Sequence, residues 1–178
     1  MSSTRVPLTD PIFRRISRLA DAQGVRAFVV GGYVRDYYLR RPSTDIDVVV
    51  VGSGIALAEA LGRELKARVS VFKTFGTAMV RAGRVEVEFV GARKESYTHD
   101  SRKPHVEAGT LEDDQRRRDF TINAMAWSLN GDTYGELVDP FDGMSDLEEC
   151  TIRTPCDPDI TFSDDPLRMM RAVRFAAQ

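Results

Sequence analysis

Two acidic residues, Asp45 and Asp47, stand at the head of a run of valines that extends from Val48 to Val51. The valines are typical of a buried strand, and side chains alternate between faces along a strand. Both acids therefore point the same way, while Ile46 points into the core. Neighbouring carboxylates repel each other, and Asp is disfavoured in strands. The pattern predicts a bound cation, and Mg²⁺ is the natural candidate because it prefers carboxylate oxygens. The alternative is that the two acids only cap a loop.

A pair of glycines lies just upstream of these acids. Gly31 and Gly32 end an expected strand from Val25 to Val30 and open a helix. Glycines expose backbone N–H groups, and the N-terminus of a helix attracts anions. Arg35, expected in the first helical turn, can bind phosphate through two N–H groups. Gly-Gly after a strand is often only a turn. Beside the acids, however, it indicates a triphosphate bridged to an acid-held metal.

The overall composition describes an ordinary globular protein. A length of 178 residues suits one domain and the start of a second, and a net charge of −2 excludes a global basic field. Cys150 and Cys156 are interpreted as reduced thiols of a cytoplasmic protein. His99 and His105 have no partners at zinc-ligand spacing, and no apolar run is long enough to span a membrane.

The spacing of apolar residues, and the glycines and prolines that bound each segment, predict the remaining elements. A helix begins at Asp10-Pro11 and ends at Gly24, and another runs from Gly54 to about Lys66. Three strands are expected near 68–72, 77–81 and 84–90. In the last strand, Glu86 and Glu88 alternate with apolar residues. This strand is either simply half-exposed, or it brings a third carboxylate to Asp45 and Asp47.

The second half of the chain is more polar. Residues 91–113 show little periodicity and predict a long mobile or disordered loop. A final helix is expected to begin with Ser163 as its N-cap and to run to Gln178 without a C-cap, so we expect further domains beyond it.

Two basic clusters have alternative interpretations. Arg116 to Arg118, followed by Asp119 and Asn123, form either a solvated charge cluster at a helix start or a clamp for ribose and polyphosphate. Four residues recur every three positions in the last helix, and they form either an ordinary salt bridge or a site that binds a base: Asp165, Arg168, Arg171 and Arg174. An acceptor beside a donor complements the edges of cytosine and adenine but not those of guanine and uracil.

From about residue 25 to its end, the chain resembles the class II tRNA nucleotidyltransferase and bacterial poly(A) polymerase family. The resemblance rests on five motifs in the family's order: Gly31-Gly-Tyr-Val-Arg-Asp36, Asp45-Ile-Asp47, Arg117-Arg-Asp-Phe-Thr-Ile-Asn-Ala124, Asp139-Pro-Phe-Asp-Gly143 and Asp164-Asp-Pro-Leu-Arg168. It implies an α+β fold with a head domain similar to DNA polymerase beta, in which helices flank a mixed sheet, followed by the start of an α-helical neck. The expected divisions are an N-terminal helix (1–24), the head (25–140) and a hinge with a truncated neck (141–178).

The resemblance also implies roles for individual residues. Asp45 and Asp47 would bind two Mg²⁺ ions, and Glu88 aligns best as the third carboxylate, with Glu86 on the same face. Nucleotide binding would be shared by three groups: Gly31, Gly32 and Arg35 for the triphosphate; Arg118, Asp119 and Asn123 for ribose and phosphate; and Asp165, Arg168, Arg171 and Arg174 for the base. Asp164 departs from the pattern, since the family usually has Glu there.

The implied activity is transfer of CMP and AMP from CTP and ATP to the 3′ end of tRNA in the cytoplasm. Close alternatives are a poly(A) polymerase or an enzyme that adds only part of the CCA triplet. The turn at residues 73–77 lacks a basic segment and favours the CCA branch. The polar loop after Gly91 resembles the loop linked in the family to the switch from C to A addition. An alternative from another class is a CTP- or ATP-binding module without chemistry. Without tRNA-grasping domains, we expect this chain alone to transfer poorly.

Overall fold

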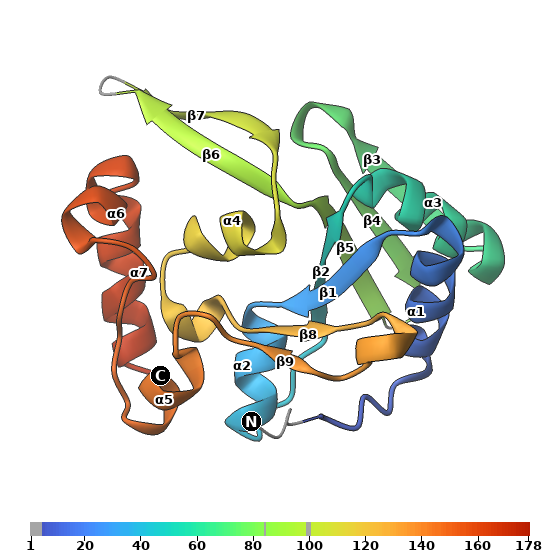
Figure 1. The fold of residues 1–178 in the computed structure, drawn as a ribbon, viewed down its shortest axis with the longest axis horizontal. Coiled ribbons are helices and arrows are strands. Elements are labelled where there is room, and N and C mark those ends of the chain that lie inside the picture. The colour runs from blue at the N-terminus through green and yellow to red at the C-terminus, as the bar shows by residue number, and fades with distance from the viewer. Residues whose placement is uncertain (1–4, 84, 99–100) are drawn as a thin grey trace.

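The computed structural model describes residues 5–83, 85–98 and 101–178 (Figure 1). Arg84, expected to begin a strand, and His99 lie outside the described residues. The helices are α1 (Pro11–Gln23), α2 (Gly32–Tyr38), α3 (Gly54–Leu65), α4 (Leu111–Arg116), α5 (Gly143–Glu148), α6 (Pro158–Asp164) and α7 (Leu167–Ala176). The strands are β1 (Arg26–Val30), β2 (Asp45–Val51), β3 (Arg68–Phe72), β4 (Thr77–Ala82), β5 (Val85–Gly91), β6 (Arg93–Thr98), β7 (Ser101–Ala108), β8 (Ala126–Ser128) and β9 (Leu137–Val138). Short 3₁₀ turns are η1 (Lys73–Phe75), η2 (Thr121–Asn123) and η3 (Gly131–Thr133).

Seven strands form one sheet in the order β3-β4-β5-β2-β1-β8-β9. Strands β2 and β5 pair in parallel, and the other neighbours in this sheet pair antiparallel. A parallel pair needs a crossover connection, and here α3, β3 and β4 supply it. The sheet is therefore mixed and flanked by helices, as the sequence predicts.

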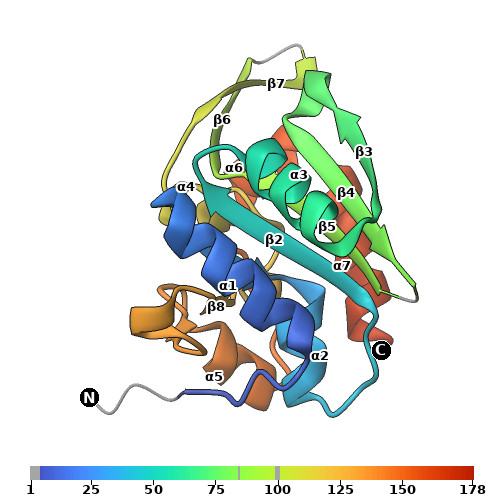
Figure 2. The ribbon, with the colours of Figure 1, turned by 90° about the vertical axis from the view of Figure 1, so that its right-hand side faces the viewer.

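One face of this sheet is covered by α1 and α3, which lie together in front of it in Figure 2. Ile46 of β2 is 3% exposed and joins Phe89 of β5 in a core that also holds Ile16 and Leu57 from the two helices. Fully burying one such side chain contributes roughly 1.5–3 kcal/mol. The apolar half of the alternation in β2 and β5 therefore fixes which face of each strand is left for the acids.

The first helix is bounded as the sequence predicts. The Asp10 carboxylate accepts a hydrogen bond from the Ile12 N–H at 2.9 Å, and Pro11 occupies the first turn. Gly24 ends the helix with φ 65°, in the left-handed region that glycine adopts without steric cost. These local contacts therefore fix where α1 begins and ends.

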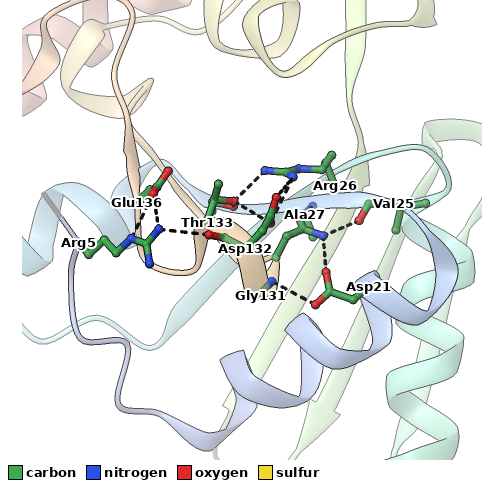
Figure 3. A network of polar contacts seen from close by, with 11 residues as sticks. Arg5, Asp21, Val25, Arg26, Ala27, Gly131, Asp132, Thr133 and Glu136 are labelled. Atoms are coloured by element: carbon green, nitrogen blue, oxygen red, sulfur yellow. Dashed lines mark hydrogen bonds and ion pairs between the residues drawn. The ribbon is translucent and has the colours of Figure 1, made fainter. Parts of the chain in front are cut away.

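A network of polar contacts attaches η3 to α1 and β1 (Figure 3). The Asp21 carboxylate accepts from the Gly131 N–H at 3.1 Å, and Arg26 pairs with Asp132 at 3.0 Å. Arg5 pairs with Glu136 at 2.6 Å on the strand side of the same turn. Exposed ion pairs of this kind contribute little each, so their effect is to fix the position of the β8–β9 edge.

The prediction of a long mobile or disordered loop over residues 91–113 is wrong. Strands β6 and β7 pair antiparallel as a separate two-stranded sheet, which projects away from the main sheet in Figure 1. Its base is closed where the Gly109 N–H donates to the Ala92 carbonyl at 3.0 Å. Because this hairpin stands off the core, its strands need no alternating apolar pattern, and periodicity gives no signal for them.

The expected N-cap at Ser163 is also wrong. Ser163 lies inside α6, which begins at Pro158 with Asp157 as its N-cap, and α7 begins only at Leu167. Asp165 between them is extended (φ −143°, ψ 96°), because a residue before proline is disfavoured in the helical region. The chain therefore forms two short helices where one was predicted.

Cys150 and Cys156 are free thiols, in agreement with the prediction. Within the described residues, no helix is both long enough and apolar enough to cross a membrane.

Candidate active site

Asp45 and Asp47 lie on the face of β2 opposite the helix-covered core. The parallel pairing with β5 sets Asp45 beside Glu86 and Asp47 beside Glu88. Because strand side chains alternate, all four acids share one face of the sheet. The prediction that the two aspartates face away from the core while Ile46 is buried is confirmed.

The four acids differ in their cationic partners. Glu86 pairs with Arg81 at 2.6 Å. Across the described part of the chain, no lysine or arginine forms an ion pair with Asp45, Asp47 or Glu88. Burial raises the pKa of Asp47, with Asp45 and Asp114 adding repulsion and Arg118 partly offsetting it. Burial, and next the charge of Asp47, raise the pKa of Glu88. The three acids together therefore carry unbalanced negative charge.

A divalent cation is suited to balance this negative charge, since Mg²⁺ prefers hard oxygen ligands such as carboxylates. Nearby acids, by contrast, already hold arginines: Asp36 pairs with Arg35 at 2.8 Å, and Asp114 with Arg117 at 2.5 Å. Among the described residues, however, no three Asp, Glu, His or Cys side chains converge closely enough to enclose a metal. Assigning Glu88 as the third ligand stays a prediction.

Gly31 connects β1 to α2 directly opposite these acids. Its φ of 76° with ψ of −135° lies in a region open essentially to glycine alone. A Cβ placed there would lie 3.1 Å from Arg118 Nη1 and 3.8 Å from Asp47 Oδ2. The sequence predicts a bare N–H group at Gly31, and this is wrong, because the Gly31 N–H donates to the Met125 carbonyl at 3.2 Å. The role of Gly31 is thus close approach of the backbone to the acid pair.

Replacing Gly31 with alanine is expected to lower the free energy of unfolding by roughly 1–3 kcal/mol, the cost of a strained backbone. It is also expected to weaken nucleotide binding, because the new methyl group crowds Arg118. Urea denaturation and calorimetric titration with ATP measure the two effects. Gly76→Ala is the matched control, because Gly76 also has a positive φ of 62° but has open space around it. Equal loss of ATP affinity in both variants would contradict this role.

Arg35 is the fourth residue of α2 and begins a chain of side-chain contacts that ends at α7. Its Nη1 donates to Asn123 Oδ1 at 2.5 Å, and Asn123 Nδ2 donates to Asp119 Oδ1 at 3.1 Å. Arg171 Nε completes the chain by donating to Asp119 Oδ2 at 2.6 Å. Predicted triphosphate, ribose and base residues are thus brought into one connected group.

The arginine cluster lies at the C-terminal end of α4, and the helix start considered from the sequence is wrong. Asp114 is fully buried and accepts from both Arg117 and Arg118, the latter at 3.1 Å. Spacings of three and four residues place these groups on one helix face. Asp114 was missed from the sequence, although its position three and four residues before two arginines is the signal that identifies it.

Residues 27–153 match the model of the poly A polymerase head domain. That match covers well over half of the chain. The chain belongs to this family.

The chain has relatives and structural neighbours of high similarity. It is 45% identical over 154 residues to an A-adding tRNA nucleotidyltransferase of Aquifex aeolicus, covering 86% of this chain and 18% of the relative. It is 39% identical over 170 residues to a CCA-adding enzyme of Enterococcus faecalis, covering 94% of this chain and 39% of that enzyme. The solved structure of a Thermotoga maritima CCA-adding enzyme complexed with tRNA superposes with a TM-score of 0.81 at 36% identity, covering 96% and 38% of the two chains. The chain thus spans less than half the length of these relatives.

Helix α7 lies beyond the matched head domain and carries three of the predicted base-binding residues. Arg168 donates to the carbonyls of Arg117 and Thr161 at 2.8 and 3.3 Å, and Arg174 lies over the Phe175 ring at 4.7 Å. Asp165 precedes the helix instead of sharing it, and its carboxylate accepts from the Leu167 N–H at 3.2 Å. The expected Asp165-to-Arg174 stripe on one helix is therefore wrong for Asp165.

Phe175, which the sequence did not single out, is a meeting point for arginines from two elements. Arg35 of α2 and Arg171 of α7 lie over its ring at 5.0 and 5.4 Å. An aromatic face beside guanidinium groups stabilises their charge. This contact holds the end of α7 against the head domain.

Proposed function

We propose that this chain carries the catalytic site of a tRNA nucleotidyltransferase, which transfers CMP and AMP from CTP and ATP to the 3′ end of tRNA. The observation that carries the proposal is the acid pair Asp45 and Asp47, which forms no ion pair with a described residue and lies near Gly31 and Arg118. The names of the relatives, which include A-adding, CCA-adding and CC-adding enzymes, support the same class of reaction.

In this proposal, Asp45 and Asp47 bind two Mg²⁺ ions, with Glu88 as the third carboxylate. Bound Mg²⁺ would neutralise charge on the triphosphate and favour ionisation of the attacking hydroxyl. Glu88 is preferred over Glu86 because Glu86 is already paired with Arg81, whereas Glu88 lies beside Asp47.

The triphosphate and ribose would be bound on the β1 side of the acids. Gly31 and Gly32 let the phosphates approach the backbone, while Arg35 and Arg118 supply positive charge. Asp119 and Asn123 already form a hydrogen-bonded pair and are suited to the ribose hydroxyls.

Base selection is assigned to Asp165 and Arg168, assisted by Arg171 and Arg174. A carboxylate accepts and a guanidinium donates, which complements cytosine and adenine. A base with the reverse order of groups would leave buried groups unpaired and would be rejected. To read the base, Arg168 would exchange its two carbonyl partners for the base edge.

The chemical step is attack of the tRNA 3′-oxygen on the α-phosphorus of the nucleotide. A new phosphodiester bond forms, the bond between the α- and β-phosphates breaks, and pyrophosphate leaves. The residues of this chain orient the reactants and stabilise charge, which is the main protein contribution in phosphoryl transfer.

A narrower activity is the second candidate. Two relatives at 45% and 38% identity are A-adding enzymes, so this protein could complete the triplet with AMP alone. We further propose three divisions of the chain: an N-terminal part (1–24) that contains α1, the head (25–140), and the hinge with the start of the neck (141–178). A tRNA substrate is consistent with work in the cytoplasm.

The proposal is tested with three tRNA substrates, ending before the CCA triplet, after the first C and after the second C. Each is incubated with Mg²⁺ and with each nucleotide singly or together, with protein in excess over tRNA so that slow transfer is visible. Growth by three nucleotides with CTP and ATP is the expected result. Growth by one nucleotide on the last substrate with ATP, together with no incorporation of CTP on the two shorter substrates, would indicate an A-adding enzyme, and a long tail would indicate a poly(A) polymerase. Binding of CTP or ATP without growth of any tRNA would indicate a nucleotide-binding module without catalytic activity.

A further inference from the structure

The open face of the sheet continues outward from the acids over β5, β4 and β3. Strand register places Val90, Thr77 and Phe72 in one row across these strands, on the same face as Glu88. A hollow of about 250 Å³ opens on this row, lined by Phe72, Thr77, Glu88, Val90, Arg93 and Arg117. The hollow therefore includes one of the proposed catalytic acids in its wall.

This hollow lies over β5, β4 and β3, on the other side of the acid pair from Gly31. In the strand order, β1 with Gly31 flanks β2 on one side, and β5, β4 and β3 flank it on the other. A transfer reaction needs two substrates that meet at the acids. Because the β1 side carries Gly31 and Arg118, the β5 side is left for the acceptor.

The lining of the hollow suits one nucleotide of a single strand. Phe72 is 47% exposed at the end of β3, although large apolar side chains are usually buried. Exposed aromatic rings beside a basic groove provide stacking surfaces for unpaired bases. The volume lies just below the roughly 300–1,000 Å³ typical of small-molecule pockets, which fits a single nucleoside unit.

Two arginines, Arg93 and Arg117, line the hollow together with Phe72. They share the nearly buried carboxylate of Glu95, at 2.8 and 3.4 Å, and Arg117 also pairs with Asp114 at 2.5 Å. Arg93 meets Glu95 through its Nε, and its terminal N–H groups are those that would bind phosphate oxygens. A stacking ring together with a phosphate-binding wall is the chemistry of single-stranded RNA recognition.

We propose that this hollow binds the 3′-terminal nucleotide of the RNA acceptor, with Phe72 stacking on its base and Arg93 contacting its phosphate. The inference rests on the proposed function and adds the position of the acceptor to it. Phe72 is a positioning residue, because it holds the terminal 3′-hydroxyl near Asp47 and Glu88 without touching the reacting atoms.

The test compares Phe72→Ala, Phe72→Leu and Phe72→Trp by steady-state kinetics, using a tRNA that lacks its terminal adenosine and ATP as donor. Loss of one stacked base corresponds to roughly a 5- to 150-fold loss of affinity. We expect Phe72→Ala and Phe72→Leu to raise the KM for tRNA about tenfold and to leave the KM for ATP unchanged. Phe72→Trp should keep the KM for tRNA of the unmodified chain, because an aromatic ring is retained. The fluorescence of the new indole should be quenched by tRNA but not by ATP.

The arginine wall is tested by salt dependence. Arg93→Gln should reduce the slope of log affinity for tRNA against log salt by about one, the value for a single phosphate contact. Arg63→Gln is the charge-matched control, because Arg63 lies exposed on α3, which covers the opposite face of the sheet. The control should leave the slope unchanged.

Two outcomes would overturn the inference while the proposed function stands. One is unchanged tRNA KM in Phe72→Ala with normal transfer, and the other is an equal rise in the KM for tRNA and for ATP. If the unmodified chain transfers no nucleotide to any tRNA, the proposed function itself fails. In that case tRNA binding that is indifferent to Phe72 would reject the hollow as well.

Discussion

Replacing Asp47 with asparagine is expected to reduce nucleotide transfer at least about a thousandfold without lowering the free energy of unfolding. The loss of several kcal/mol of charge stabilisation corresponds to a rate reduction of this size. Stability should hold or rise, because Asp47 is half-buried beside Asp45 and Asp114 and its pKa is raised mainly by burial. A group whose charged form is disfavoured in the folded state gains stability when the charge is removed. Single-turnover transfer assays and urea denaturation measure the two quantities.

Glu86→Gln is the matched control, since it removes one carboxylate from the same face of the sheet. Glu86 is paired with Arg81 on the exposed side, so this change should leave transfer within about twofold and stability within about 0.5 kcal/mol. If Asp47→Asn retained transfer equal to Glu86→Gln, the acid pair would not be the catalytic centre.

Replacing Trp127 with alanine is expected to cost roughly 3–5 kcal/mol of unfolding free energy, the usual penalty for deleting a large buried aromatic side chain. Trp127 is fully buried on β8, and its ring contacts Tyr33, Tyr37 and Tyr38 edge-on, with centroids 6.3, 4.9 and 5.8 Å away. All three tyrosines belong to α2. The cavity left by the ring would therefore loosen the helix that follows the glycine pair.

The same variant should raise the KM for ATP in the fraction that remains folded, because α2 carries Arg35. Trp127→Phe separates packing from hydrogen bonding. It keeps an aromatic ring but removes the donation from Trp127 Nε1 to the Tyr38 hydroxyl at 3.2 Å, which should cost only about 1 kcal/mol. A denaturation midpoint for Trp127→Ala equal to that of the unmodified chain would show that α2 is positioned by other contacts.

The first half of the fold could be predicted from sequence because local signals and core burial agree there. Asp10-Pro11 and Gly24 bound α1 as expected, and the alternation around Ile46 fixes which face of β2 carries the acids. Helix-capping residues and the alternation of apolar and polar residues are sufficient to predict an element when one of its faces packs on the core.

The second half could not be predicted in the same way because its structure depends on contacts between distant residues. The β6–β7 hairpin is defined by backbone pairing between strands that show no apolar alternation in the sequence. Asp157-Pro158 and Ser163 both resemble helix starts, but Ser163 lies inside α6, which ends before the extended residue Asp165 that precedes Pro166. The connection of Arg35 to Arg171 through Asn123 and Asp119 joins residues whose separation in sequence hides their proximity.

The parallel pairing of β2 with β5 has a consequence for how the protein folds. Strands β1 and β2 are neighbours in sequence and can pair early. Asp47 of β2 meets Glu88 of β5 later, because α3, β3 and β4 separate these two strands in the sequence. Pairings between residues far apart in sequence carry a larger entropy of loop closure and form slowly. The repulsion between Asp47 and Glu88 therefore arises only at a late step, when part of the sheet already exists to hold them together. During synthesis on the ribosome, the site stays unassembled until β5 has emerged.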